Sequence, residues 1–119
     1  MVTRGLRDIA QLDKTRAEEL LKRGKAFFDN GDYDKAIADF TEAIRLDPKY
    51  AVAYNNRGSA YSSMGEFDKA IADYTEAIRL KPNDDIAYSL RASTYIKKGD
   101  RGKAKLDLEQ AKRLGNGNG

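Results

Sequence analysis

A repeat with a period of 34 residues is the feature that most limits how this chain of 119 residues can fold. The segment DKAIADFTEAIRL begins at Asp34 and returns at Asp68 with a single change, from Phe40 to Tyr74. A third copy is weaker but stays in register. Positions shared by all three copies include Gly31, Gly65 and Gly99, then Ala36, Ala70 and Ala104, and also Arg23, Arg57 and Arg91. Such self-similarity predicts small structural units that stack on one another.

Each unit has the pattern of two helices joined by a glycine turn. Apolar residues recur every three or four positions on both sides of the turn, as they do on the buried face of a helix. Gly31 can adopt the left-handed conformation that ends a helix, and Asp32 is placed to cap the helix that follows. Pro48 and Pro82 close the first two units, since proline cannot continue a helix. The predicted units cover residues 17–50, 51–84 and 85–118.

The segment 1–14 precedes the first unit. Thr15 and Glu18 have the spacing of a capping box, which predicts that the first helix of the repeats begins at Thr15. An apolar stripe in the preceding segment is expected to form a short helix that covers the first unit; disorder and pairing with a second copy of the chain are the alternatives. The stripe consists of Leu6, Ile9, Ala10 and Leu12.

The third unit differs from the others on the face where a further unit would pack. Lys105 and Lys112 stand where the first two units have isoleucine. Burying an unpaired ammonium group is costly, so these lysines are expected to face solvent and to end the stack. We therefore expect one domain over residues 15–114, followed by a flexible tail over residues 115–119.

The composition excludes most catalytic chemistry. The chain has neither histidine nor cysteine, so the usual general base, the thiol nucleophile and the commonest transition-metal ligands are missing. No catalytic residue, metal site or cofactor is expected. With 34% charged and 40% hydrophobic residues and no long apolar run, the chain is expected to be a cytoplasmic protein, and a processed periplasmic form is the alternative.

The residue types at these spacings resemble those of the tetratricopeptide repeat family. The second unit matches the family pattern throughout, at Tyr54, Gly58, Tyr61, Gly65, Phe67, Ala70, Tyr74, Ala77 and Pro82. The third unit departs from the pattern at Ala92, Arg101, Leu108 and Asn116. The resemblance implies an all-α, right-handed superhelical solenoid of three helical hairpins. It also implies a non-enzymatic adaptor or scaffold whose concave groove binds a peptide or helix of a partner protein.

The resemblance assigns this groove to the first helix of each unit. The implied groove residues are Leu21, Lys22, Lys25 and Phe28 in the first unit, Asn55, Asn56, Ser59 and Ser62 in the second, and Ser89, Leu90, Ser93 and Lys97 in the third. Asn56 is the leading candidate, because an amide side chain can both donate a hydrogen bond to a peptide backbone and accept one from it.

Members of the family that bind chaperone C-termini use a clamp of lysine, asparagine and arginine side chains. Of the clamp positions this chain retains Asn56, while Leu21, Lys25, Ile86 and Leu90 differ from the clamp residues. Tight binding of chaperone tails is therefore not expected. The apolar groove positions indicate instead a partner with an apolar anchor residue.

Two further sets of side chains follow the same period. An ion pair between the two helices is expected in every unit: Arg23 with Asp39, Arg57 with Asp73, and Arg91 with Asp107. The tyrosines that repeat are expected to be core residues rather than a surface for stacking bases: Tyr54, Tyr61, Tyr74, Tyr88 and Tyr95.

Two alternatives to a peptide-binding adaptor stay open at this point. One is a homo-oligomerising scaffold joined through the N-terminal segment or through an uncovered helix face. The other is a basic module for RNA or acidic surfaces, because residues 85–119 carry eight basic side chains against four acidic ones. A solvated end of the stack also explains this charge, and we expect a protein or peptide partner, neither nucleic acid nor a membrane, with a homodimer as a further option.

Overall fold

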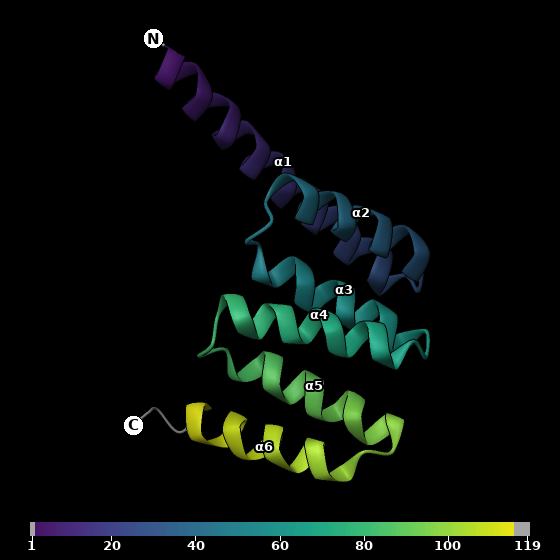
Figure 1. Cartoon of the computed structure of the whole chain (residues 1–119). Coiled ribbons are helices and arrows are strands. Elements are labelled where there is room, and N and C mark those ends of the chain that lie inside the picture. Colours follow the sequence, from purple (N-terminus) through teal and green to yellow (C-terminus); the bar gives the residue numbers. More distant parts are fainter. Residues whose placement is uncertain (1, 116–119) are drawn as a thin grey trace.

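The computed structural model describes the backbone of residues 2–115 and the side chains of residues 5–115. Its helices are α1 (Val2–Asp29), α2 (Tyr33–Leu46), α3 (Ala51–Ser63), α4 (Phe67–Leu80), α5 (Asp85–Lys98) and α6 (Arg101–Gly115). They form three consecutive hairpins, each packed on the next, in a stack of 54 × 36 × 19 Å (Figure 1). The predicted all-α solenoid of helical hairpins is confirmed. None of the helices described is long and apolar enough to cross a membrane.

A glycine in the left-handed conformation makes the turn inside each hairpin. The three turn glycines are Gly31, Gly65 and Gly99, with φ values of 81°, 80° and 97°. In the first turn, the amide N–H of Asp32 donates to the carbonyl oxygen of Phe27 at 2.8 Å, and the amide N–H of Gly31 donates to the carbonyl oxygen of Phe28 at 2.9 Å. These bonds satisfy the last carbonyl groups of α1. The prediction for Asp32 is wrong in one respect: the residue precedes α2, but its side chain makes no capping hydrogen bond.

Close contact between a glycine and an aromatic ring brings the two helices of a hairpin together. A Cβ atom on Gly24 would lie 2.5 Å from Cε1 of Phe40, and one on Gly58 would lie 2.8 Å from Cε1 of Tyr74. Both rings are fully buried as a result. In the third hairpin Ala92 stands at the position of the glycine and Leu108 at that of the ring, so a larger residue on the first helix goes with a smaller one on the second.

The predicted ion pair between the two helices is present in every hairpin. Arg57 donates from Nε and Nη2 to the carboxylate of Asp73, at 2.9 and 2.8 Å. The equivalent pairs, Arg23 with Asp39 and Arg91 with Asp107, have the same two bonds at 2.8 to 2.9 Å. All three carboxylates are buried, so the arginine also satisfies acceptors that water does not reach.

The repeating tyrosines are core residues only in part. Tyr74 is 1% exposed, as predicted. The other four are half-buried: Tyr54, Tyr61, Tyr88 and Tyr95. Their rings flank guanidinium groups instead of filling the core; Cζ of Arg57, for example, lies 5.7 and 6.0 Å from the ring centroids of Tyr54 and Tyr61. The core prediction is wrong for these four, because each ring packs on the arginine of its own unit at the edge of the hairpin.

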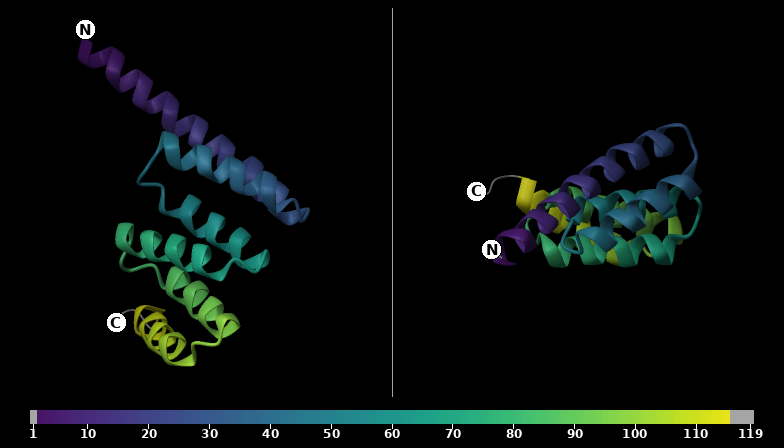
Figure 2. Two further views of the ribbon diagram at one scale, coloured as in Figure 1. Left: turned by 45° about the vertical axis from the view of Figure 1, so that its right-hand side comes forward. Right: turned by 90° about the horizontal axis from the view of Figure 1, so that it is seen from above.

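The first helix begins well before the repeats. Thr15 lies inside α1, and its hydroxyl donates to the carbonyl of Gln11 at 3.0 Å, so the helix start predicted at Thr15 is wrong. Residues 6–23 contain neither glycine nor proline, and nothing interrupts the helix there. The first half of α1 projects beyond α2 (Figures 1 and 2). Its apolar stripe covers no part of the first hairpin, since Leu6, Ile9 and Leu12 are 62%, 57% and 68% exposed.

The last helix presents a mixed face to solvent. Lys105 and Lys112 are exposed, as predicted. Leu106 and Leu108 on the same helix are exposed as well, which the sequence pattern did not predict. Of the predicted tail, Gly115 is the last residue of α6, and residues 116–119 lie outside the described part of the chain.

Candidate functional site

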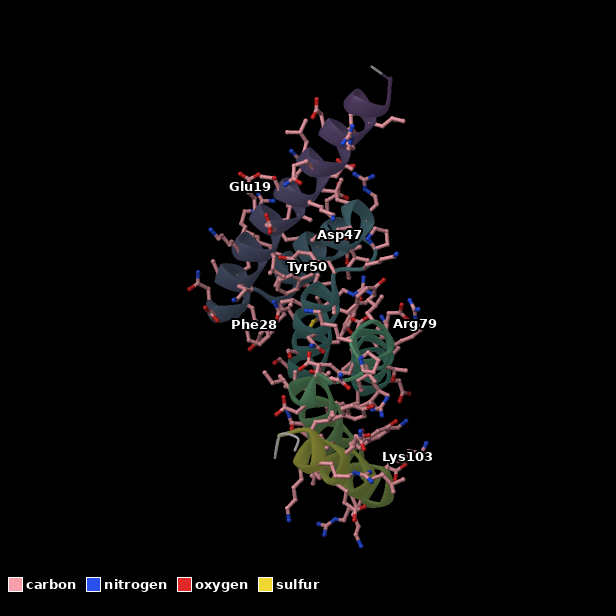
Figure 3. All side chains as sticks on the ribbon, turned by 90° about the vertical axis from the view of Figure 1, so that its left-hand side faces the viewer. Glu19, Phe28, Asp47, Tyr50, Arg79 and Lys103 are labelled. Carbon is pink, nitrogen blue, oxygen red and sulfur yellow. The ribbon has the colours of Figure 1, made fainter. Side chains whose placement is uncertain are left out.

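The first helices of the three hairpins, α1, α3 and α5, line one side of the stack. Figure 3 shows Phe28 of α1 on this side, and Arg79 of α4 and Lys103 of α6 along the other. A hollow of about 210 Å³ lies between α1 and α3. Its lining residues are Lys25, Phe28, Asp29, Phe40, Asn56 and Ser59, all but Phe40 from these two helices.

A second hollow continues the first one toward α5. It has a volume of about 130 Å³ and shares Phe28 and Ser59 with the first hollow. Its other lining residues are Ser62, Ser63, Tyr74, Leu90, Ser93, Thr94 and Lys97. We call the two hollows together the groove. It therefore has lining residues from all three hairpins.

An aromatic side chain lies at the middle of the groove. Phe28 borders both hollows from the last turn of α1. Its ring meets the edge of the Tyr33 ring, with the centroids 5.3 Å apart and the planes at 64°. This edge-to-face contact orients a half-buried apolar surface toward the groove. Leu90 of α5 adds a second apolar side chain on the other side of the second hollow.

Two adjacent asparagines on α3 have different surroundings. Asn55 turns toward the third hairpin, and its Nδ2 donates to Asp84 at 3.3 Å. Asn56 lines the first hollow, and its Nδ2 is buried without a hydrogen-bond partner among the described residues. A buried amide nitrogen without an acceptor is unfavourable by roughly 1–3 kcal/mol. A carbonyl oxygen of a bound ligand can remove this deficit at Asn56 once the side chain turns its Nδ2 into the hollow.

The wall between α3 and α5 carries hydroxyl groups. Ser59 and the Tyr74 hydroxyl lie 3.1 Å apart, and Ser62 and Thr94 lie 3.3 Å apart. Burial raises the pKa of Tyr74 above its ordinary value, although hydrogen bonds from Ser59 and Thr94 oppose this shift. The ring hydroxyl therefore stays neutral at physiological pH and keeps its place in this network.

Three charged side chains border the groove. Lys25 and Asp29 border the first hollow, and Lys97 borders the second. The other lining residues are aromatic, aliphatic, amide and hydroxyl side chains. Within the described part of the chain, no three His, Cys, Asp or Glu side chains are grouped closely enough to hold a metal ion.

The structure brings together eight of the twelve residues assigned to the groove from the sequence. These are Lys25, Phe28, Asn56, Ser59, Ser62, Leu90, Ser93 and Lys97. Lys22 and Ser89 are exposed but border neither hollow. Leu21 lies in the core of the first hairpin and Asn55 is buried against the third, so neither lines the groove.

Sequence reasoning missed five lining residues: Asp29, Phe40, Ser63, Tyr74 and Thr94. Phe40 and Tyr74 come from the second helix of their hairpins and reach the groove from behind. A 34-residue count along the first helices cannot identify these two residues. The available signal was the glycine opposite each ring, because a glycine has no side chain to separate the ring from the groove.

Three family models for the tetratricopeptide repeat match the chain, at residues 24–65, 51–84 and 86–114. Together they reach from residue 24, in the last part of α1, to residue 114 in α6. The comparison with curated proteins gave no significant match.

Several solved structures share the whole fold. The first tetratricopeptide domain of Spaghetti (RPAP3), bound to the HSP90 peptide SRMEEVD, is 31% identical with a TM-score of 0.84, over 88% of this chain and 83% of that one. The TPR2B domain of yeast Sti1 in a complex with pHsp70 is 32% identical with a TM-score of 0.83, over 87% and 86%. MamA is 37% identical with a TM-score of 0.82, over 88% of this chain and 61% of its own length.

Proposed function

Because the chain belongs to the tetratricopeptide repeat family, we propose that it is a non-enzymatic adaptor that binds a peptide or helix of a partner protein in the groove. The two hollows give this proposal a continuous surface across α1, α3 and α5. The solved relatives that hold HSP90 and Hsp70 peptides support a polypeptide ligand as the class.

The unpaired amide of Asn56 is the observation that carries the proposal. Its Nδ2 is buried in the wall of the first hollow and lacks an acceptor among the described residues. A peptide backbone offers carbonyl oxygens at regular intervals, so an extended ligand can supply that acceptor without a specific side chain. Asn56 therefore fixes the ligand's position, and the groove side chains select its sequence.

An apolar anchor residue is the feature we propose for the partner. Phe28 and Leu90 are the half-buried apolar groups that border the groove, since Phe40, which also lines it, is fully buried. Leu21 and Ile86, which the sequence also suggested as apolar contacts, do not take part: Leu21 is in the hairpin core, and Ile86 is exposed and borders neither hollow. One large apolar side chain seated between Phe28 and Leu90 matches this surface.

A library of random peptides displayed on phage is the probe that tests this function. We expect it to yield peptides with one large apolar residue, whose affinity is then measured by calorimetry. Asn56→Ala is expected to weaken the selected peptide about tenfold, because one hydrogen bond to a buried amide is lost. Asn83→Ala is the matched control, since Asn83 is an exposed asparagine in the loop before α5. Peptides that bind Asn56→Ala as tightly as the parent protein would refute the groove as the site.

A further inference from the structure

Contacts between successive hairpins repeat in register. We call each contact surface between one hairpin and the next a joint; the first joins α1–α2 to α3–α4, and the second joins α3–α4 to α5–α6. In the first joint Arg57 Nη1 donates to the hydroxyl of Thr41 at 3.2 Å. In the second, Arg91 Nη1 donates to the hydroxyl of Thr75 at 3.1 Å. The same bond therefore links the second helix of one hairpin to the first helix of the next.

Three side-chain positions also repeat from one joint to the other. In the second joint they hold Ser62, Tyr74 and Thr94, and the hydroxyls of Ser62 and Thr94 lie 3.3 Å apart. The equivalent positions of the first joint, one 34-residue period earlier, hold Phe28, Phe40 and Ala60. Phe40 and Ala60 are fully buried. The three positions are thus polar in one joint and apolar in the other, and in both two of them belong to one hairpin and one to the next.

The last hairpin carries one half of a further joint. Ile96 and Leu108 occupy the positions of Ser62 and Tyr74 and are 50% and 47% exposed. Both border a shallow hollow of about 390 Å³ on the outer side of α6. Glu109 occupies the position of Thr75, is exposed, and forms no ion pair with any side chain that the structure describes.

The matching half lies on α1. Arg23 occupies the position of Arg91, and its side chain is 65% exposed. It uses Nε and Nη2 to bind Asp39, so Nη1 has no hydrogen bond within the described residues. Ala26 occupies the position of Ala60 and is exposed. A shallow hollow of about 210 Å³, bordered by Leu20 and Arg23, lies on this side of α1.

From this register we propose that copies of the chain stack end to end, with the α5–α6 hairpin of one copy against α1 of the next. Glu109 of one copy accepts a hydrogen bond from Arg23 Nη1 of its neighbour, a charged counterpart of the bond that Thr75 makes within the chain. Ile96 and Leu108 cover the neighbour's Ala26, at the positions that Phe28, Phe40 and Ala60 hold in the first joint.

Charges on the two end faces agree with this contact. In the first joint, Ala53 and Ile44 belong to one packed cluster. Between copies, Glu19 takes the position of Ala53, and Lys112 takes that of Ile44. The ammonium group that faces solvent in the single chain therefore meets a carboxylate when copies stack. Arg16 and Lys105 add like charges to the two faces and keep the association weak and reversible.

The contact is heterologous, because it joins two different surfaces of the same chain. Such contacts give open rows of molecules unless the rotation between neighbours closes a ring. The two surfaces lie at opposite ends of the stack (Figure 2), so one copy can bind two neighbours at once. The groove lies between the ends and stays uncovered.

Sedimentation equilibrium over a dilution series tests the proposal. The average mass is expected to rise from the 13.3 kDa of one chain past the value for two chains, with no plateau at the dimer. Leu108→Glu removes the contact surface on α6, and Ala26→Glu removes the one on α1; both positions are exposed, so folding is expected to survive. Each variant alone is expected to remain a single chain. Mixed in equal amounts they are expected to form a 1:1 dimer and nothing larger, because each retains one intact surface.

Two control variants separate this contact from others. Ile86→Glu places the same charge at an exposed apolar residue away from both end surfaces and is expected to associate like the parent. Ile9→Glu tests pairing through the projecting half of α1 and is also expected to have no effect. A constant mass of one chain at every concentration, association retained in Leu108→Glu, or loss of association in Ile9→Glu would each overturn end-to-end stacking.

Discussion

The first and second hairpins contain the same ion pair in different surroundings. Arg23 and Arg57 each make two hydrogen bonds to a buried aspartate, at 2.8 to 2.9 Å. The Arg57 side chain is only 20% exposed, flanked by Tyr54 and Tyr61 and bonded to Thr41 of the preceding hairpin. Arg23 is 65% exposed and has one ring beside it, because Leu20 stands where the second hairpin has a tyrosine.

The geometry of the ion pair is encoded within one repeat, whereas the burial of its arginine depends on the neighbouring repeat. The 34-residue period reproduces the geometry of the pair in each hairpin, whereas burial of the arginine depends on a preceding hairpin and on a second aromatic ring. An exposed ion pair contributes little to stability, and a desolvated one is costly to break. The ion pairs have the same hydrogen-bond distances, but we expect them to contribute unequally to the free energy of unfolding.

Removing the buried arginine is expected to have the largest effect. Arg57→Ala leaves the carboxylate of Asp73, 7% exposed, without a partner, and should lower the free energy of unfolding by about 3 kcal/mol. Urea unfolding followed by circular dichroism measures this loss. Arg91→Ala, with its arginine 18% exposed, is expected to behave similarly. Arg23→Ala also leaves a buried carboxylate, but it is expected to lose less, because water can take the place of an arginine that is already 65% exposed. Equal losses for all three variants would contradict the role given to the neighbouring hairpin.

A smaller loss is expected from filling the gap in front of the buried ring. Gly58→Ala places a Cβ atom 2.8 Å from Tyr74, and the overpacking should cost about 2 kcal/mol after the gain in helix propensity. Adding Tyr74→Leu reproduces the alanine and leucine of the third hairpin and should recover part of that loss. Thermal unfolding of both single variants and the double variant measures the coupling; simple additivity would show that the two positions do not compete for space.

Much of the fold follows from the sequence because its signals occur in each repeat. A glycine turn and an arginine paired with an aspartate are each local, and the 34-residue period places them three times; a glycine facing a ring is placed twice. The start of α1 had no such support. Thr15 and Glu18 match a capping box, but a threonine inside a helix can bond the carbonyl four residues back equally well, and Thr15 does.

The groove could be predicted less completely than the fold. The position shared by Leu21, Asn55 and Ser89 looks equivalent in sequence, yet it is buried in the first two hairpins and exposed in the third. A following hairpin lies beside the first two and not beside the third. Exposure at this position is thus decided by the neighbouring unit, which the repeat pattern alone does not specify.

Titration of the buried tyrosine gives a further contrast between the two hairpins. Burial raises the pKa of Tyr74, while the equivalent Phe40 cannot ionise. Below the pKa of an unfolded tyrosine, near 10, the hydroxyl is neutral in both states and the free energy of unfolding keeps its full value. As the pH rises from there through the folded pKa, the hydroxyl ionises first in the unfolded state, and the free energy of unfolding falls. Between pH 10 and 11 the parent should lose up to about 1 kcal/mol more than Tyr74→Phe. Parallel stability curves for the two proteins would exclude a buried ionisable hydroxyl.

The smallest effect is expected from giving Arg23 the second ring that Arg57 has. Leu20→Tyr places a phenol on α1 where Tyr54 lies on α3, and a ring against a guanidinium group is favourable even at a partly exposed site. We expect the melting temperature to rise by about 2 °C. Arg23→Ala in the Leu20→Tyr background is the control, since it removes the partner of the new ring and should cancel the gain. A gain that persists without Arg23 would mean that the tyrosine acts through apolar packing alone, and the difference between the hairpins would then depend on the preceding unit and not on the missing ring.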